Sequence, residues 1–264
     1  MITQNKDIEC NSIPFIRIPI PVVYNLMFKD LFTKIDNVFT RYGKDSQEEK
    51  FFSNVVGYID IKKLLLKCIV SREPVHVLLT GPPSSSKTIF LIEMLQGLDD
   101  AHFVDAVGSS AAGMIDHLFR NDTKYLLIDE IDKMKKSNQS ALLNVMETGI
   151  LSETKLNGKT RQKEMNLWIF ATSNDVEGLS LPLRSRFMEL ELDEYTYEEF
   201  IEIVRRLLKK KYHLEATVCE KIGHEVWHNI KSRDIRDAVR IAKLTQSPAD
   251  VDWLIQVQKR YRKK

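Results

Sequence analysis

The chain lacks several features that would assign it quickly to a class of proteins. Only three of its 264 residues are cysteine, and Cys10, Cys68 and Cys219 form no CxxC or Cys/His spacing. This argues against a disulfide framework or a Cys/His metal site and is typical of reduced thiols in a cytoplasmic protein. No apolar run approaches the length that spans a membrane, and MITQNKDIEC lacks the order of a signal peptide. We therefore expect a cytoplasmic protein without membrane contact.

A strong charge of one sign is also absent. Lysine and arginine number 39 against 37 acidic residues, so the formal net charge is +2. A global nucleic-acid signature is thereby excluded, and binding to DNA must rest on local patches. Hydrophobic residues make up 43% and charged residues 29%, which is ordinary for a globular protein with one large or two modest domains. Internal repeats and low-complexity segments are missing as well.

What is present is an ordered series of apolar and amphipathic segments. In residues 51–192, the apolar strands VHVLLT, HFVDA, YLLIDE, LWIFATSN and MELELD alternate with amphipathic helices. This order is typical of a parallel sheet covered by helices on both faces. Residues 193–246 contain helical patterns only, and residues 247–264 continue as a helix into the basic tail QKRYRKK. Residues 1–50, with the proline-interrupted stretch IPFIRIPIP, form an accessory segment to which we assign no chemistry.

The segment VHVLLTGPPSSSKT, residues 75–88, carries the most specific chemistry. Its apolar strand enters a short loop that ends in Lys-Thr and opens the helical pattern IFLIEMLQGL. Backbone N–H groups of such a loop, with the helix N-terminus behind them, point at the phosphates of a nucleotide triphosphate. Lys87 then reaches the β- and γ-phosphates and Thr88 offers its hydroxyl to Mg²⁺. The predicted phosphate-binding residues are Gly81, Pro82, Pro83, Ser84, Ser85, Ser86, Lys87, Thr88 and Ile89.

Ser86 departs from the P-loop pattern, which has glycine directly before the lysine. A Cβ at this position crowds the approach of the backbone to phosphate. Taken alone, the segment fits both an imperfect P-loop and a strand–turn–helix without nucleotide. The rest of the chain must decide between them.

Two further strands end in polar residues that fit the P-loop interpretation. Asp129 and Glu130 follow YLLI, and Asn174 ends LWIFATSN. At the carboxyl edge of a parallel sheet these side chains lie beside the phosphate loop. Asp129 then holds Mg²⁺ through water, Glu130 orients or deprotonates the attacking water, and Asn174 lies next to the γ-phosphate. Alone, an acidic pair after a strand is more often a helix cap, and an Asn at a strand end is often a turn residue, but together with the loop they indicate hydrolysis.

Two arginine clusters complete the pattern. Arg184 and Arg186 precede the last strand, where either guanidinium can reach a γ-phosphate in an adjacent subunit. Arg233, Arg236 and Arg240 recur at spacings of three and four, so a helix through them would present all three on one face. One of these contacts the nucleotide from above in this interpretation, while the others are solvated. Surface arginines without a function remain the alternative for both clusters.

The ordered set resembles the AAA+ ATPases over residues 51–246. GPPSSSKT is similar to the family's Walker A motif, LLIDE to Walker B, FATSN to sensor 1, LRSRF to the arginine-finger segment and SRDIRDA to sensor 2. The resemblance implies a P-loop NTPase with a central parallel β-sheet flanked by helices and a small all-α lid. It implies ATP and Mg²⁺ as ligands, Val56 and Gly57 beside the adenine, and Arg233 as the lid contact. An arginine finger acting in trans implies a homo-oligomer, most often a hexameric ring.

Residues 150–167 indicate the branch of the family. ILSETKL and KTRQKEMNLW flank Asn157-Gly158, which predicts a two-residue turn and a β-hairpin before the sensor 1 strand. Such an insertion resembles the hairpin of RuvB-type Holliday-junction motors, minichromosome-maintenance helicases and MoxR-type chaperones. Its cations can contact DNA phosphates inside a ring without reading bases, as can the basic tail. These cations are Lys155, Lys159, Arg161 and Lys163. An ordinary solvated hairpin is the alternative.

Three functions fit this pattern. The first is a RuvB-like ATP-driven DNA helicase, translocase or remodeller, gripping DNA by the hairpin, the tail or a protein adaptor, because about fifty residues precede the core and about twenty follow the lid. The second is a MoxR-like chaperone that remodels protein. The third is an assembly subunit that binds ATP but hydrolyses it poorly, which Ser86 suggests and Glu130 argues against.

Overall fold

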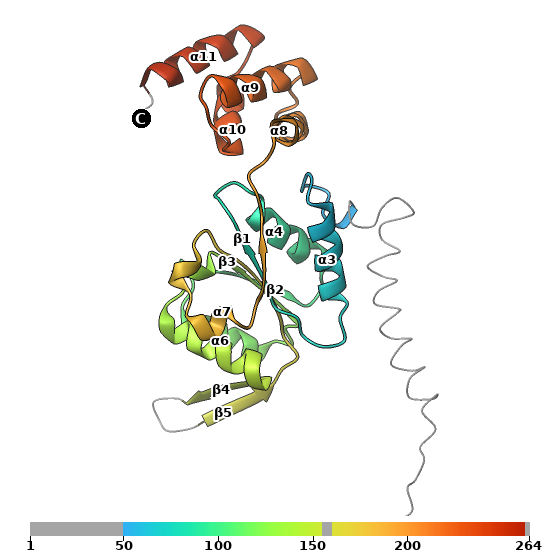
Figure 1. Cartoon of the computed structure of the whole chain (residues 1–264), viewed down its shortest axis with the longest axis vertical. Coiled ribbons are helices and arrows are strands. Elements are labelled where there is room, and N and C mark those ends of the chain that lie inside the picture. Colours follow the sequence, from blue (N-terminus) through green and yellow to red (C-terminus); the bar gives the residue numbers. More distant parts are fainter. Residues whose placement is uncertain (1–49, 155–159, 262–264) are drawn as a thin grey trace, which may run out of the picture. The chain divides into compact units, whose positions relative to one another are not determined.

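A parallel five-stranded sheet lies at the centre of the computed structural model, which describes residues 50–154 and 160–261. These described residues belong to one compact unit of the chain. The sheet order is β2-β3-β6-β1-β7, and every neighbouring pair is parallel (Figure 1). Its strands are β1 (Val77–Thr80), β2 (Ala101–Asp105), β3 (Tyr125–Asp129), β6 (Trp168–Thr172) and β7 (Met188–Glu191).

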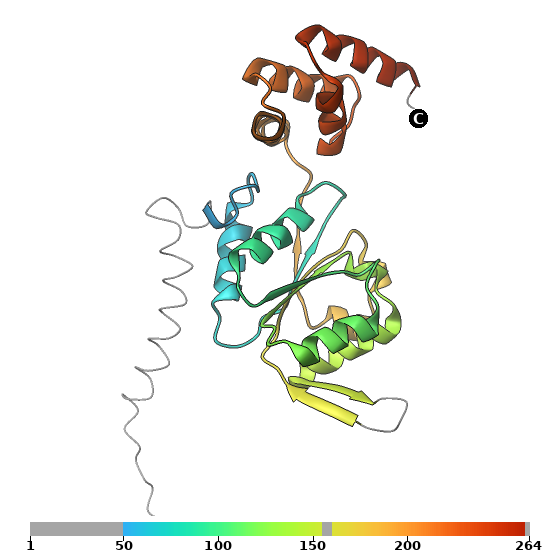
Figure 2. The same cartoon turned by 180° about the vertical axis from the view of Figure 1, so that it is seen from behind.

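Helices cover both faces of this sheet, which explains why its central strands are almost continuously apolar. One face carries α3 (Ile59–Ile69) and α4 (Lys87–Gly97), and the other carries α5 (Ala111–Arg120), α6 (Lys136–Thr148) and α7 (Leu181–Arg184) (Figures 1 and 2). All five residues of β6 are buried. Two short 3-10 turns, η1 (Ile131–Lys133) and η2 (Val176–Gly178), follow β3 and β6.

Each face of the sheet has its own packed core. On the side of α5 to α7, strand residues such as Leu126 and Ile169 pack against helix residues such as Met114 and Leu142. On the opposite side α4 packs against β2, β3 and β6. Burial of one such side chain stabilises the fold by about 1.5–3 kcal/mol, so this apolar pattern holds the carboxyl ends of the strands in place.

A β-hairpin precedes β6, as the sequence pattern predicts. Its strands β4 (Ile150–Thr154) and β5 (Thr160–Glu164) are antiparallel, with Ile150 opposite Glu164 and Thr154 opposite Thr160. The hairpin packs against α5 and α6. The expected Asn157-Gly158 turn lies outside the described residues.

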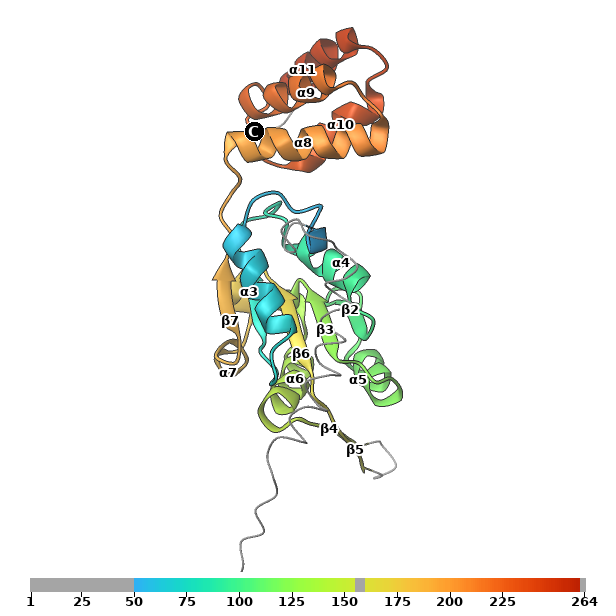
Figure 3. The same cartoon turned by 90° about the vertical axis from the view of Figure 1, so that its right-hand side faces the viewer.

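Four helices follow the sheet and form a separate apolar core (Figure 3). They are α8 (Tyr197–Tyr212), α9 (Ala216–His228), α10 (Ile235–Leu244) and α11 (Pro248–Tyr261). Thr196 and Glu199 form a reciprocal capping box that starts α8 directly after the sheet. The predicted fold class, an α/β P-loop NTPase followed by a small all-α lid, is confirmed.

Other expectations concern the location and boundaries of the chain. Within residues 50–154 and 160–261, no helix has both the length and the apolar composition that crossing a bilayer requires. Cys68 and Cys219 are free and buried. Cys10, the accessory segment up to residue 49, and the last three tail residues lie outside the described residues. The proposed domain boundaries, at 1–50, 51–192, 193–246 and 247–264, stay predictions.

Candidate nucleotide-binding site

The loop between β1 and α4 has the backbone shape of a phosphate cradle. Ser84 and Ser86 have φ angles of 70° and 63°, in the left-handed region that favours glycine. Gly81, at φ 136°, has no alternative, because a Cβ there would lie 2.2 Å from the Leu192 carbonyl oxygen. Ser86, which replaces the glycine of the P-loop pattern, therefore holds a left-handed backbone conformation that glycine would adopt with less strain.

Lys87 lies inside this loop and is only 6% exposed. Its Nζ donates to the carbonyl oxygens of Gly81 at 2.8 Å and Pro82 at 2.7 Å, and to Ser85 Oγ at 3.1 Å. Burial lowers the pKa of this ammonium to about 8, and the nearby carboxylate of Asp129 opposes that shift. A buried cation held by neutral acceptors gains a stronger partner when a polyphosphate enters the loop.

Thr88 and Asp129 bring oxygen ligands together at the start of α4. Thr88 Oγ1 lies 3.0 Å from both carboxylate oxygens of Asp129, and the Thr172 hydroxyl also donates to this carboxylate. A hydroxyl and a carboxylate beside a phosphate loop suit Mg²⁺, which takes one or two protein oxygens and completes its shell with water and phosphate. Within residues 50–154 and 160–261, no cluster of three or more His, Cys, Asp or Glu side chains could hold a metal by itself. The residues fit the ion only together with a nucleotide.

A cavity of about 1160 Å³ opens beside the loop. Glu130 and Asn174, the ends of the β3 and β6 patterns, both line it. The Glu130 backbone N–H donates to Thr172 Oγ1 at 3.1 Å, which fixes the turn after β3. Predicted site residues on its wall also include Val56, Pro83, Ser84, Ser85, Ser86, Lys87, Thr88 and Ile89.

Gly57, Gly81 and Pro82 lie behind this wall. Gly81 and Pro82 act through their carbonyls on Lys87, as described above. Gly57 packs against α8, because a Cβ on it would lie 2.5 Å from Glu199 Oε1. Of the residues predicted to border the adenine, Val56 is thus the one on the cavity wall.

Helices α8 and α10 supply part of the cavity wall, and most of these residues are not among the predicted site residues. The apolar residues Ile203, Leu207, Ile235 and Val239 line it and suit a planar base. Arg206, Lys210 and His213 also line it, and Lys210 Nζ donates to Asn54 Oδ1 at 3.2 Å. The sequence pattern predicts that α8 is an amphipathic helix, but its position over the phosphate loop depends on tertiary packing.

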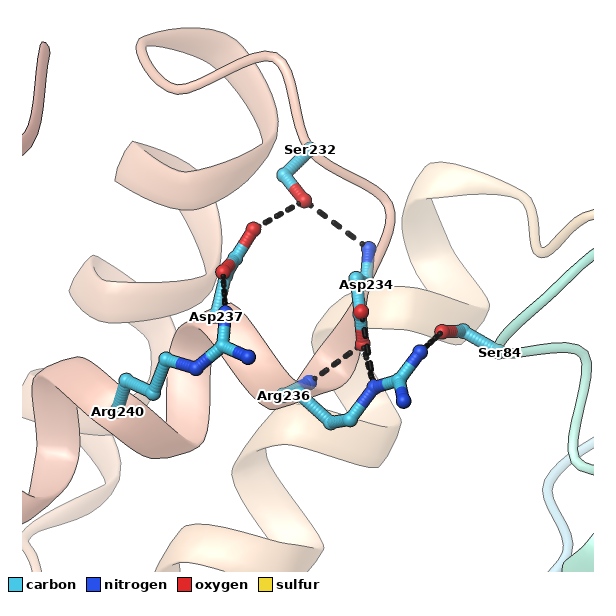
Figure 4. A network of polar contacts seen from close by, with 6 residues as sticks. All are labelled: Ser84, Ser232, Asp234, Arg236, Asp237 and Arg240. Carbon is cyan, nitrogen blue, oxygen red and sulfur yellow. Dashed lines mark hydrogen bonds and ion pairs between the residues drawn. The ribbon is translucent and has the colours of Figure 1, made fainter. Parts of the chain in front are cut away.

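Among the arginines at the start of α10, the one on the cavity wall is Arg236, whereas the predicted nucleotide contact is Arg233. Arg236 lines the cavity, and its Nη2 lies 3.4 Å from Ser84 Oγ of the phosphate loop (Figure 4). Asp234 holds this guanidinium at 2.9 and 3.0 Å. Arg233 instead pairs with Glu194 and stacks on Trp227.

The remaining arginine of that cluster, Arg240, pairs with Asp237 at 2.7 Å. Asp237 in turn accepts from the Ser232 hydroxyl at 2.6 Å (Figure 4). The expectation of three arginines on one helix face needs correction, because α10 begins at Ile235 and Arg233 precedes it.

Arg184 and Arg186 lie at the amino-terminal end of the parallel strands, whereas the phosphate loop lies at their carboxyl-terminal end. β7 runs parallel to β1 with Met188 opposite Val77, so both arginines stand before the start of the strand whose far end faces the loop. Its four residues span about 13 Å. Glu189 holds Arg184 through two contacts of 2.5 and 2.8 Å, whereas Arg186 makes one contact with Glu147. Neither arginine is placed to serve its own loop.

Of the four hairpin cations, the two that the structure describes, Arg161 and Lys163, have partners within the chain. Arg161 pairs with Glu153 at 2.7 Å and Asp116 at 2.9 Å and lies over the Phe119 ring. Lys163 Nζ donates to the carbonyl oxygens that end α5, at 3.1 Å to Leu118 and 2.7 Å to Asn121. These two cations join the hairpin to α5, which differs from the expected phosphate contacts.

The other two cations of the hairpin, Lys155 and Lys159, lie outside the described residues. Their predicted contact with phosphate therefore stays a prediction.

Comparison with known proteins finds a family match for the central part of the chain. Residues 77–193 match the model of the ATPase family associated with various cellular activities (AAA). A Lon protease of Fusobacterium nucleatum is 28% identical over an alignment of 228 positions, which covers 75% of this chain and 28% of that protein. The DNA replication licensing factor mcm4-B of Xenopus laevis is 28% identical over an alignment of 145 positions, which covers 49% of this chain and 17% of that protein. The chain thus spans less than a third of either relative.

Solved structures show the same fold. The RuvB Holliday junction branch migration motor of Thermotoga maritima matches with a TM-score of 0.57 and 23% identity, over 76% of this chain and 70% of that chain. A variant of this RuvB matches with a TM-score of 0.61 and 23% identity, over 78% and 72%. At this identity the likeness concerns the fold alone.

Proposed function

We propose that this chain, whose residues 77–193 match the model of the AAA ATPase family, binds ATP with Mg²⁺ in the cavity beside α4 and hydrolyses it. The observation that carries the proposal is the convergence of Lys87, Glu130 and Asn174 on one cavity, with Thr88 3.0 Å from Asp129. The family and the fold support ATPase activity in general.

Each residue has a role in this proposal. Lys87 exchanges its loop carbonyls for β- and γ-phosphate oxygens, and Glu130 orients the attacking water and accepts its proton. Asn174 donates to the γ-phosphate or to that water. Thr88 and Asp129 would hold Mg²⁺, which supplies charge neutralisation of the phosphates when bound. Arg236, above the loop, replaces Arg233 as the proposed lid contact to the nucleotide.

Hydrolysis in this proposal requires a second copy of the chain. Arg186 and Arg184 stand before the start of β7, at the end of the strands opposite the phosphate loop. A guanidinium therefore reaches a γ-phosphate only across a subunit interface. The single contact of Arg186 leaves it freer to turn than the doubly held Arg184. We therefore propose Arg186 as the arginine finger of a homo-oligomer, with a hexameric ring as the expected form.

The proposed substrate of this motor is DNA. Support comes from the fold shared with a branch migration motor and from the similarity to a replication licensing factor. The hairpin is the proposed contact, through Lys155 and Lys159, while Arg161 and Lys163 join its strands to α5. Phosphate contacts of this kind add affinity without sequence preference.

Protein remodelling is the second candidate. The Lon protease similarity covers 75% of this chain, more than the 49% covered by the licensing factor. In that case the hairpin contacts polypeptide instead of DNA, while the ATP site is unchanged.

An ATPase assay with and without DNA separates these candidates. Glu130→Gln is expected to bind ATP but not to turn it over, and Lys87→Ala to lose binding. Stimulation by DNA that falls steeply with added salt supports the motor. Stimulation by an unfolded protein and not by DNA supports remodelling. A wild-type chain that binds ATP without turnover would favour an assembly subunit over both.

A further inference from the structure

Ser86 joins the phosphate loop to the helices that cover it. Its side chain is 7% exposed, and its Oγ accepts a hydrogen bond from the hydroxyl of Tyr195, 109 residues later. Tyr195 stands between the end of β7 and Thr196, the residue that caps α8. The serine that departs from the P-loop pattern therefore directly contacts the segment that joins β7 to α8, residues 192–196, which we call the connector.

Tyr195 is built to act as a neutral donor. It is 4% exposed, and burial raises its pKa to about 12, so it keeps its proton at any physiological pH. Its ring lies 5.7 Å from that of Tyr58, whose hydroxyl donates to the Asp193 carbonyl oxygen at 2.6 Å. The connector is also held at its start, where Leu192 N donates to Thr80 O at 2.8 Å.

The conformation of Ser86 sets backbone strain against the hydrogen bond that its hydroxyl makes. A left-handed φ of 63° disfavours every residue with a Cβ, so glycine would relieve strain at this position. Glycine or alanine would, however, leave the buried Tyr195 hydroxyl without its acceptor. Because Ser86 accepts from Tyr195, its own hydrogen is available for donation, and Ser86 lines the cavity in which the phosphates would lie.

We propose that Ser86 and Tyr195 form a relay that couples phosphate occupancy of the loop to the position of α8 and α10. Ser86 donates to a phosphate oxygen while it accepts from Tyr195, so the bound phosphate orders the connector and, through it, the lid. Both are positioning residues. The inference rests on the proposed ATP binding and adds to it the path by which the lid responds to the nucleotide.

Three variants separate the relay from a structural role. Tyr195→Phe removes the donor alone, Ser86→Ala removes the acceptor but keeps the strained backbone, and Ser86→Gly removes both acceptor and strain. Tyr197→Phe is the matched control, because this tyrosine, two residues away, packs on Trp227 and His228 instead of the loop. Each full-length variant is examined by amide hydrogen exchange without nucleotide, with ADP and with a non-hydrolysable ATP analogue.

In the wild-type protein we expect the ATP analogue to protect α10 more than ADP does. Tyr195→Phe, Ser86→Ala and Ser86→Gly should each lose this difference. Tyr195→Phe should bind the analogue about fivefold more weakly, the loss expected for one neutral hydrogen bond, whereas the two Ser86 variants also lose the bond to a charged phosphate and should bind at least about tenfold more weakly. The double variant Tyr195→Phe/Ser86→Ala should be no weaker than Ser86→Ala alone, and Tyr197→Phe should resemble the wild type. Ser86→Gly should unfold at a higher temperature than Ser86→Ala without regaining the coupling.

Two results overturn the proposal in distinguishable ways. If Tyr195→Phe and Ser86→Gly keep the wild-type protection of α10, the relay is wrong while ATP binding stands. If the wild-type protein shows no nucleotide-dependent protection of the loop itself, the proposed function fails and the relay falls with it.

Discussion

Arg236 Nη2 lies 3.4 Å from the hydroxyl oxygen of Ser84, which places a guanidinium of α10 directly on the phosphate loop. The same guanidinium is oriented by the Asp234 carboxylate. Burial raises the pKa of this carboxyl, but its hydrogen bonds to Arg236 and Ser84 together outweigh burial and lower the pKa below its usual value. A cation held in this position can move from a neutral hydroxyl to a phosphate oxygen without leaving its carboxylate partner.

Arg236→Ala is therefore expected to weaken ATP binding about tenfold, because it removes a charge-assisted contact to phosphate. Isothermal titration of the full-length chain measures this. Arg233→Ala is the matched control, because Arg233 pairs with Glu194 and not with the phosphate loop. The affinity of this variant for ATP should stay within about twofold of the wild-type value. A larger loss for Arg233→Ala than for Arg236→Ala would contradict this assignment.

Arg186→Ala should leave ATP binding nearly unchanged and slow hydrolysis by about a thousandfold, the lower range for loss of an arginine finger. Removing the doubly held Arg184 should have a smaller effect on turnover. Steady-state ATPase rates and nucleotide affinities of each variant test this.

Mixing two inactive variants shows whether the finger acts between subunits. Glu130→Gln keeps its finger and lacks the water-activating carboxylate, whereas Arg186→Ala has the reverse defect. At an interface where the Arg186 finger of a Glu130→Gln subunit faces the Glu130 site of an Arg186→Ala subunit, one active site is restored. Mixtures at several ratios should recover part of the wild-type rate, and a complete lack of recovery at every ratio argues against an interface with a finger.

The sheet and its loop could be predicted from the sequence because both are local patterns. The strand WIFAT is buried at all five positions, so its apolar run identifies it without knowledge of its neighbours. The lid contact could not be predicted from spacing alone. Asp234 accepts from the Arg236 backbone N–H and starts the helix at Ile235, which leaves Arg233 before the helix. An aspartate before a periodic segment is an N-cap signal, so this information was present in the chain.

The long-range partners of polar and charged side chains could not be predicted from the sequence. Arg161 meets Asp116, which lies 45 residues earlier on α5. Tyr195 meets Ser86 across 109 residues. Neither contact has a local pattern, because both depend on how helices and strands pack after the chain has folded.

The hairpin should therefore show two kinds of cation. Replacing Arg161 and Lys163 by alanine is expected to loosen β4 and β5 from α5, because it removes the pair with Asp116 and the cap on the Leu118 and Asn121 carbonyls. Hydrogen exchange of β4 and β5 should become several-fold faster. Replacing Lys155 and Lys159 should leave this exchange unchanged but reduce stimulation of the ATPase by DNA and lessen its salt dependence. Equal effects of the two double variants on DNA stimulation and on exchange would contradict the division.

The pKa of Lys87 makes ATP binding depend on pH. Burial lowers this pKa to about 8 in the nucleotide-free protein, while a bound polyphosphate favours the charged form and raises it. ATP affinity should therefore be full below pH 8 and fall as the pH rises, by up to tenfold per unit until the pKa of the bound state is reached. The stability of the nucleotide-free fold changes with pH in the opposite direction. The unfolded lysine binds its proton up to about pH 10.5, so between pH 8 and that value this group favours the nucleotide-free folded protein increasingly as the pH rises. Titration calorimetry at pH 8 in buffers of different ionisation enthalpy should show uptake of about half a proton on ATP binding. Lys87→Arg keeps its charge throughout this range and serves as the control, and proton uptake equal to that of the control would contradict the lowered pKa.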